Sequence, residues 1–202
     1  MPDTIQRRRV LVNSVMERIG EISAVGVPDR SVLSLLRDEL LKLAAHPELF
    51  DQADFPPPAD PSRSSNMFVL HRCGDGGPTL YVSIAPAGLA TPVHFHSTWA
   101  IIVGLRGEEL NRFYERDSSG HPVETGSFVV CRGTAITMLP DDLHSIRILE
   151  TPERFFSFHL YGRPFEMSTD RMFYSETARE WTYFAHRPMI RTFDLERGVA
   201  VD

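Results

Sequence analysis

Cysteine is scarce in this chain of 202 residues, which has only Cys73 and Cys131, far apart in the sequence. So few cysteines exclude a small secreted scaffold built on disulfides and fit a reducing compartment better. Long apolar runs are also missing, because no stretch approaches the ~18 residues of a membrane-spanning helix. The first twenty residues carry no such run after their charges, so we expect no secretory signal. We therefore expect a cytoplasmic protein without a membrane partner.

An excess of positive charge is absent as well. The chain has 21 Lys and Arg against 27 Asp and Glu, a net charge of −6. The one basic cluster, Arg7, Arg8 and Arg9, leads into a helical pattern and is interpreted as the solvated start of a helix. We therefore expect no nucleic-acid partner. With 42% hydrophobic residues, the whole of 1–202 fits a single globular domain.

Apolar residues recur at helical spacing in two segments near the start of the chain. The first covers residues 5–23 and the second residues 30–45, where Asp29 or Ser31 is the candidate N-cap. Pro47 follows and ends the second pattern. Residues 1–50 are therefore predicted to form two N-terminal helices, and residues 51–65, rich in Pro, Asp and Ser, a linker.

From residue 66 to 163 the pattern changes to short strands separated by turn residues. The predicted strands are 67–71, 79–86, 92–97, 99–105, 109–115, 127–131, 135–139, 143–150 and 155–161. Eight or nine strands at such spacing predict a sandwich or barrel, with a jelly roll as the natural candidate. Residues 164–202 are mixed and aromatic-rich, and we expect them to cover one end of the barrel.

Histidines gather in the predicted barrel. In PVHFHSTW, His94 and His96 are two residues apart and would point to the same face of a strand. A third, His144 in LPDDLHSIRIL, alternates with Ile146 and Ile148 and is expected to face inward. Three imidazoles on an apolar wall predict a metal site, although imidazole alone suits Fe, Zn, Cu or Ni. The solitary histidines are expected to be structural: His46, His121 and His186.

The segment FFSFHLYG places Ser157, His159 and Tyr161 on one face of a strand. The intervening positions are apolar: Phe156, Phe158 and Leu160. Such a column is either a polar stripe on an exposed face or a hydrogen-bond relay. Beside a metal site, a relay that orients the phenol toward the metal is the preferred interpretation.

His-x-His followed by a histidine after a Pro-Asp-Asp turn resembles the ligand spacing of the cupin superfamily. The segments TPVHFHSTWAIIVGLRGEE, LPDDLHSIRI and FSFHLYG together resemble the thiol dioxygenases. The likeness is closer to the bacterial 3-mercaptopropionate dioxygenase branch than to the mammalian cysteine dioxygenases. It implies a mainly β fold, a cupin jelly-roll barrel (double-stranded β-helix) with two N-terminal α-helices. It also implies oxidation of a thiol to its sulfinic acid by O2.

By this resemblance, Fe(II) is the cofactor and two groups of residues form the site. The implied metal ligands are His94, His96 and His144. The implied outer-sphere triad is Ser157, His159 and Tyr161.

The sequence departs from the family pattern at several positions. No glutamate follows within five residues of His96, so the expected ligand set is three neutral imidazoles. Ala100 stands where the mammalian enzymes have the cysteine that crosslinks to the tyrosine, so no thioether is expected on Tyr161. Phe95 replaces a common aspartate. The early strand lacks the arginine that holds the carboxylate of cysteine, since Arg72 is displaced.

The substrate is therefore expected to be a mercapto carboxylic acid rather than cysteine. Arg171 matches an arginine of the mercaptopropionate branch, and Arg163 is a nearer alternative for binding the carboxylate. Either arginine could instead form a surface salt bridge. Phe95 and Trp99 are expected to add apolar bulk beside the ligands, which favours a larger or less polar thiol.

Two other functions stay open on the sequence alone. One is a cupin oxygenase that acts on a substrate other than a thiol, and the other is a non-catalytic cupin that binds a small ligand. The expected partners are a small thiol and O2, and the expected state is a monomer or a small homo-oligomer.

Overall fold

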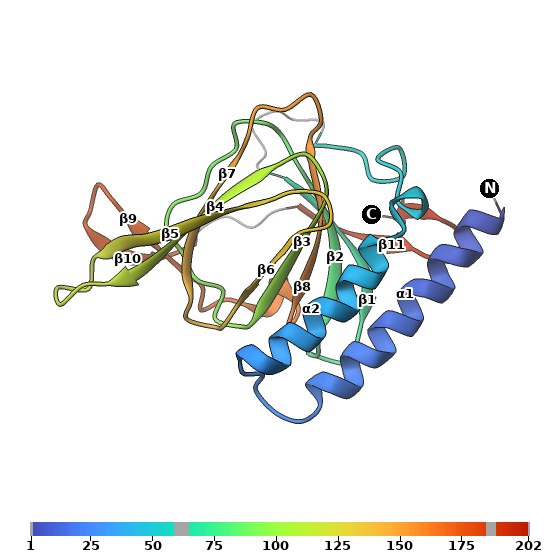
Figure 1. Ribbon diagram of the computed structural model, residues 1–202, viewed down its shortest axis with the longest axis horizontal. Helices are drawn as coiled ribbons and strands as arrows, with labels where there is room; N and C mark the ends of the chain where they lie inside the picture. Colours follow the sequence, from blue (N-terminus) through green and yellow to red (C-terminus); the bar gives the residue numbers. More distant parts are fainter. Residues whose placement is uncertain (1, 59–64, 185–188, 202) are drawn as a thin grey trace.

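The computed structural model describes residues 2–58, 65–184 and 189–201 (Figure 1). Two α-helices come first: α1 (Pro2–Ser23) and α2 (Arg30–Ala44). Two short 3-10 turns follow at Pro47–Leu49 and Phe165–Met167. The strands are β1 (Asn66–Arg72), β2 (Thr79–Ala85), β3 (Ala100–Arg106), β4 (Glu109–Arg116), β5 (Pro122–Val130), β6 (Ala135–Met138), β7 (Leu143–Ile148), β8 (Phe155–Tyr161), β9 (Met172–Ser175), β10 (Glu180–Tyr183), β11 (Met189–Asp194) and β12 (Val199–Val201). Part of the predicted linker, residues 59–64, lies outside the described ranges.

Two sheets form the barrel. A seven-stranded sheet has the order β12-β11-β1-β2-β8-β3-β6, and a three-stranded sheet has the order β5-β4-β7. Side chains from both sheets line one internal cavity, so the sheets face each other as in a jelly roll. Strands β9 and β10 pair with each other, and β9 also forms backbone hydrogen bonds with Val93 and Phe95. The prediction of a mainly β jelly-roll barrel with two N-terminal helices is confirmed.

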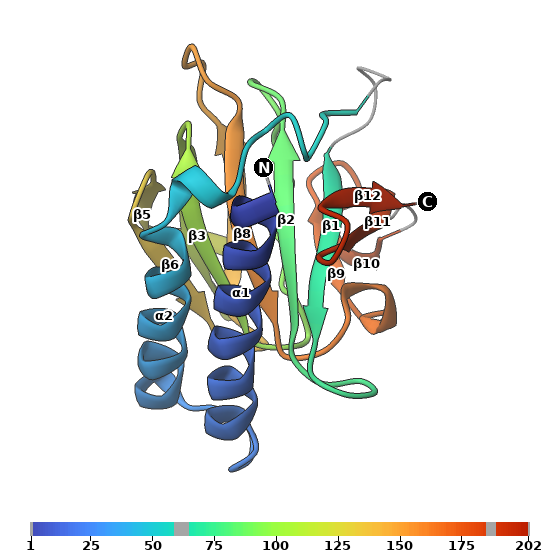
Figure 2. The same cartoon turned by 90° about the vertical axis from the view of Figure 1, so that its right-hand side faces the viewer.

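The central strands of the large sheet are buried on both faces: β1, β2, β3 and β8. Both helices cover the outer face of this sheet, as Figure 2 shows. On β8, Phe156, Phe158 and Leu160 pack in this outer layer. Ser157 and Tyr161, at the alternate positions, point into the barrel and are 0% and 3% exposed. The polar column of β8 is therefore internal, and its interpretation as a stripe on an exposed face is wrong.

Helix α2 begins where its sequence predicts. Of the two candidate caps, Asp29 is the N-cap, because its carboxylate accepts hydrogen bonds from the backbone N–H groups of Ser31 and Val32, both at 2.9 Å. The buried face of this helix consists of Leu33, Leu36, Leu40, Leu43 and Ala44. Within the described ranges, no helix is long and apolar enough to cross a membrane.

The C-terminal segment does more than cover one end of the barrel. Strand β11 pairs in parallel with β1, and β12 then pairs with β11, so both extend the large sheet. The β9–β10 hairpin lies at the end of the molecule away from the two helices (Figure 1). There the indole N–H of Trp181 donates to the backbone oxygen of Gly120 at 3.0 Å. None of these four strands was predicted, because short strands rich in aromatics lack a clear alternating pattern.

Arg8 contradicts the prediction of a solvated basic cluster at the start of the first helix. Its side chain is 2% exposed, its Nε donates to the backbone oxygen of Leu49 at 2.5 Å, and its guanidinium pairs with Asp54. Three aromatic rings lie 5.1–5.7 Å from the guanidinium carbon: Phe50, Phe55 and Phe193. This one side chain therefore joins α1 to the segment after α2 and to β11.

We predict that Arg8→Met lowers the free energy of unfolding by about 2–3 kcal/mol, because it removes the hydrogen bond to Leu49 and leaves Asp54 without its buried partner. Urea denaturation measures this loss. Arg9→Met is the matched control, since Arg9 contacts the exposed Glu196 at 3.5 Å and the exposed Gln6 at 2.9 Å, and its substitution should change stability by less than about 0.5 kcal/mol. Equal effects of the two substitutions would contradict a special role for Arg8.

Candidate metal centre

The barrel encloses a cavity of about 310 Å³ between the two sheets. Most of its wall is apolar. Its charged, imidazole and phenol groups are His94, His96, Glu109, His144, His159, Tyr161 and Arg171. The structure therefore brings the histidines of three separate sequence segments to one internal surface.

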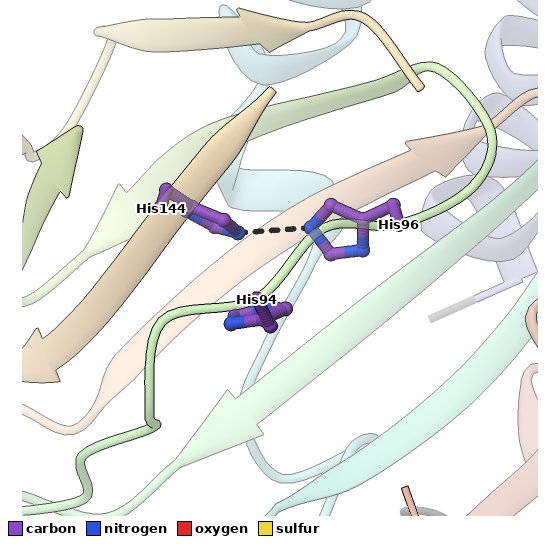
Figure 3. Close-up of side chains that lie close together, drawn as sticks. All are labelled: His94, His96 and His144. Carbon is purple, nitrogen blue, oxygen red and sulfur yellow. Dashed lines mark hydrogen bonds between the residues drawn. The ribbon is translucent and has the colours of Figure 1, made fainter. Parts of the chain in front are cut away.

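His94, His96 and His144 lie together at this surface (Figure 3). One ring nitrogen from each lies within 4.8 Å of the others, and the Nε2 atoms of His96 and His144 are 2.9 Å apart. The three side chains are 3–4% exposed. Such a buried cluster of converging nitrogen atoms can hold one metal ion.

The segment before β3 is not the regular strand predicted for residues 92–97. His94 and His144 form an isolated antiparallel bridge, exchanging backbone hydrogen bonds of 2.8 and 3.0 Å. Ser97 has φ of 56°, which turns the chain directly after His96. Its N–H donates to the backbone oxygen of Pro140 at 3.0 Å. The prediction that the two histidines converge is nevertheless confirmed, because their ring centroids are 5.1 Å apart.

Hydrogen bonds orient two of the three rings. The Nδ1 atom of His94 lies 3.0 Å from the backbone oxygen of Pro92, and that of His144 lies 3.0 Å from the Oδ1 atom of Asn111. Because each oxygen accepts, each Nδ1 carries the proton and each Nε2 offers a lone pair. In His96, Nδ1 is buried without a hydrogen-bond partner among the described residues. The ring orientations of His94 and His144 thus suit metal binding through Nε2.

Burial keeps the three imidazoles uncharged. It lowers the pKa of His94 to about 3 and the pKa values of His96 and His144 well below their usual value, and the positive charge of Arg171 acts in the same direction. Neutral imidazole is the form that binds a metal. Among the described residues, the group that could hold the ion contains no carboxylate. The site therefore fits a divalent cation that keeps its full charge for anionic ligands.

The polar column on β8 forms a continuous relay. The ring of His159 lies between two hydroxyl groups, with Nε2 at 3.0 Å from Ser157 Oγ and Nδ1 at 3.1 Å from the Tyr161 hydroxyl. Burial lowers the pKa of His159 to about 3 and raises the pKa of Tyr161 above its usual value. The Tyr161 ring centroid is 5.3 Å from that of His96. A protonated phenol is thus available beside the three-histidine cluster.

The two candidate arginines occupy different places. Arg171 lines the cavity and is 9% exposed, with its guanidinium carbon 4.1 Å from the ring centroid of Phe165 and 4.7 Å from that of Phe184. Arg163 does not line the cavity. Its guanidinium pairs with Asp170 instead. A ligand inside the cavity can therefore meet Arg171 but not Arg163.

Phe95 and Trp99 do not provide the apolar bulk expected beside the ligands, because neither lines the cavity. The Phe95 ring lies 5.9 Å from that of Trp181, and Trp99 packs in the outer layer with the helices. The expected preference for a larger or less polar thiol therefore finds no support in these two side chains and stays a prediction. The apolar cavity wall near Arg171 comes instead from Phe165 and Phe184.

Sequence reasoning missed the role of β4 in the site. Glu109 lines the cavity, and Asn111 is fully buried two residues later on the same face. Burial raises the pKa of Glu109 to about 7, while a hydrogen bond from Asn111 opposes this rise. The sequence signal that could have indicated this role is the spacing of Glu109 and Asn111, two polar residues at alternate positions of a predicted strand.

Two of the three solitary histidines lie apart from the cluster. His46 is exposed, and its Nδ1 lies 3.3 Å from Glu48. His121 lies in the turn before β5, with its Nδ1 3.8 Å from Asp117. His186 lies outside the described residues.

Comparison with solved structures finds proteins of distant likeness. No family model matches the chain. An RmlC-like cupin protein from Ralstonia eutropha is similar over 63% of this chain and 71% of its own, with 16% identity and a TM-score of 0.43. The Cnp3 cupin domain of Schizosaccharomyces pombe is similar over 52% and 71%, with 14% identity and a TM-score of 0.39. For the DMSP lyase DddQ from Ruegeria pomeroyi, the shares are 56% and 53%, the identity is 22% and the TM-score is 0.38. Functional conclusions therefore rest on the site itself.

We predict that His144→Ala abolishes retention of a divalent metal while the barrel stays folded, because two imidazoles and water are a poor ligand set. Anaerobic loading with Fe(II), gel filtration and metal analysis measure the metal-to-protein ratio. His159→Gln is the matched control, since this imidazole lines the same cavity but has both nitrogens engaged by hydroxyl groups. A full complement of metal in His144→Ala would contradict the three-histidine site.

Proposed function

We propose that this protein is a non-haem Fe(II) thiol dioxygenase that oxidises a small mercapto carboxylic acid to its sulfinic acid. The observation that supports this most is the combination within one cavity of three neutral imidazoles, the hydroxyl of Tyr161 and the cation of Arg171. The motif resemblance to the thiol dioxygenases supports the same function.

The proposed reaction converts R–SH and O2 into R–SO2H. The S–H bond and the O–O bond break, two S–O bonds form, and the proton ends on the sulfinic acid. Sulfur loses four electrons, which reduce both atoms of O2, so no further reductant is required. Bound Fe(II) would supply the redox chemistry that allows the thiolate and O2 to react. His94, His96 and His144 would hold it without adding negative charge.

The protein's own residues would bind and orient the substrate. Arg171 would pair with the carboxylate, since a guanidinium bound to a carboxylate gives a strong and directional contact. Its packing on two phenylalanine rings limits where the guanidinium can lie. Tyr161 would donate a hydrogen bond to the reacting groups, while His159 and Ser157 keep its hydroxyl in place.

Two alternatives make different predictions. A barrel that only binds a ligand has no need of a buried hydroxyl–imidazole–hydroxyl relay beside its metal. An oxygenase for another substrate class would leave thiols unchanged. O2 uptake and sulfinate formation with 3-mercaptopropionate, cysteine, cysteamine and mercaptosuccinate separate these cases. Oxidation of 3-mercaptopropionate or mercaptosuccinate in preference to cysteine supports the proposal.

Tyr161→Phe should leave metal retention intact and lower sulfinate formation by roughly 10²-fold, the effect of losing one positioned donor. Loss of the Tyr161 hydroxyl can also reduce coupling, so that O2 is consumed but less sulfinate is formed. Parallel measurement of O2 and sulfinate distinguishes the two effects. Unchanged rate and coupling would show that the relay is purely structural.

Arg171→Met should lower kcat/KM for mercapto carboxylic acids by about ten- to a hundredfold, because it removes a charge-assisted contact but keeps an apolar chain between the rings. Cysteamine, which has no carboxylate, should show no such loss. Arg163→Met is the control outside the cavity and should leave kcat/KM within about twofold of wild type. Equal kcat/KM in wild type and Arg171→Met would overturn the assignment of the carboxylate site.

A further inference from the structure

We infer that Glu109 and Asn111 are positioning residues that set the proton on His144 and thereby the strength of metal binding. The inference rests on the three-histidine metal site of the proposed function. It concerns β4, whose residues contribute none of the three imidazoles.

The three side chains form an unbroken hydrogen-bonded line. The Nδ2 atom of Asn111 donates to Glu109 Oε1 at 2.9 Å, and Asn111 Oδ1 lies 3.0 Å from His144 Nδ1. The exposed fractions of Glu109, Asn111 and His144 are 2%, 0% and 3%. Strands β4 and β7 pair directly, which brings the three residues together. Because all three side chains are buried, water cannot readily replace a hydrogen-bond partner that a substitution removes.

The directions of these two hydrogen bonds determine which nitrogen of His144 carries the proton. An ionised carboxylate only accepts, so ionised Glu109 requires the NH2 group of Asn111 to face it. The carbonyl oxygen of the same amide then faces His144 and must receive a proton from Nδ1. The Nε2 atom of His144 is left with its lone pair, directed toward His96 Nε2 at 2.9 Å.

The reversed amide would have the opposite consequence. If the NH2 group of Asn111 faced His144, Nδ1 would accept and the ring proton would move to Nε2, where it blocks the metal. Ionised Glu109 prevents this reversal, because two buried acceptor oxygens would then face each other. Glu109 therefore acts on the metal through Asn111, without contact to the ion.

Substitutions that break or reverse this line provide the test. Asn111→Leu removes both hydrogen bonds and should weaken metal binding by about ten- to a hundredfold, the usual effect of losing such a partner of a metal-bound histidine. Asn111→Asp alone places two acidic groups side by side. Combining it with Glu109→Gln restores the order, because the glutamine NH2 group can donate to the aspartate, which accepts from His144. The double variant should regain affinity to within about threefold of wild type.

Tyr114→Phe is the matched control. Tyr114 also lies on β4, and its hydroxyl meets the Ser145 hydroxyl on β7 at 3.1 Å, next to His144 in sequence. This substitution loosens the same strand pair but leaves the line to the ring intact. It should keep wild-type metal affinity.

Two readouts that are independent of thiol oxidation decide the outcome. Competition between the protein and a chelator for Co(II) measures metal affinity, and long-range ¹H–¹⁵N spectra of histidine-labelled apoprotein report which nitrogen of His144 carries the proton. We expect the Nδ1–H form in wild type and in the double variant, and a mixture in Asn111→Leu. Wild-type Co(II) affinity in folded Asn111→Leu, or no recovery in the double variant, would overturn the inference. If wild type binds Co(II) but oxidises no thiol, the proposed function fails while this test still stands.

Discussion

The close burial of three uncharged imidazoles is the constraint on which the rest of the site depends. A buried polar nitrogen without a partner costs about 1–3 kcal/mol. A protonated ring nitrogen therefore requires an acceptor, and an unprotonated one requires a donor or a metal ion. The backbone oxygen of Pro92 and the amide of Asn111 satisfy two of the Nδ1 atoms. The Nε2 atoms of His96 and His144, 2.9 Å apart, need a proton or a cation between them. A shared metal ion satisfies this need at both Nε2 atoms, while Nδ1 of His96 stays without a hydrogen-bond partner among the described residues.

Charge in the cavity follows from the same constraint. Neutral ligands leave a divalent cation uncompensated, and Arg171 adds a second positive charge to the same cavity wall. An anionic molecule that reaches both is favoured over a neutral one. The large sheet lies between the two helices and the cavity. Its strand β8 packs its apolar side chains outward against the helices, which holds the polar side chains on its other face in position inside the cavity.

Local patterns predicted much of the fold and of the site. Helical spacing located both helices, and strict alternation on β8 placed Ser157, His159 and Tyr161 on one face. Long-range contacts were beyond such patterns. The burial of Arg8 depends on aromatic rings distant in sequence, and the line from Glu109 to His144 exists only because β4 and β7 are neighbours. Spacing alone also overestimated the regularity of the segment around the first two histidines.

X-ray absorption at the iron edge is the most direct test of the central claim, that three imidazoles hold a metal to which a thiol binds. Anaerobic Fe(II)-loaded protein is measured before and after addition of 3-mercaptopropionate. The account predicts scattering from three imidazole rings in both samples and one additional sulfur scatterer after the thiol is added. Iron with fewer than three imidazoles, or no sulfur scatterer at saturating thiol, would contradict it.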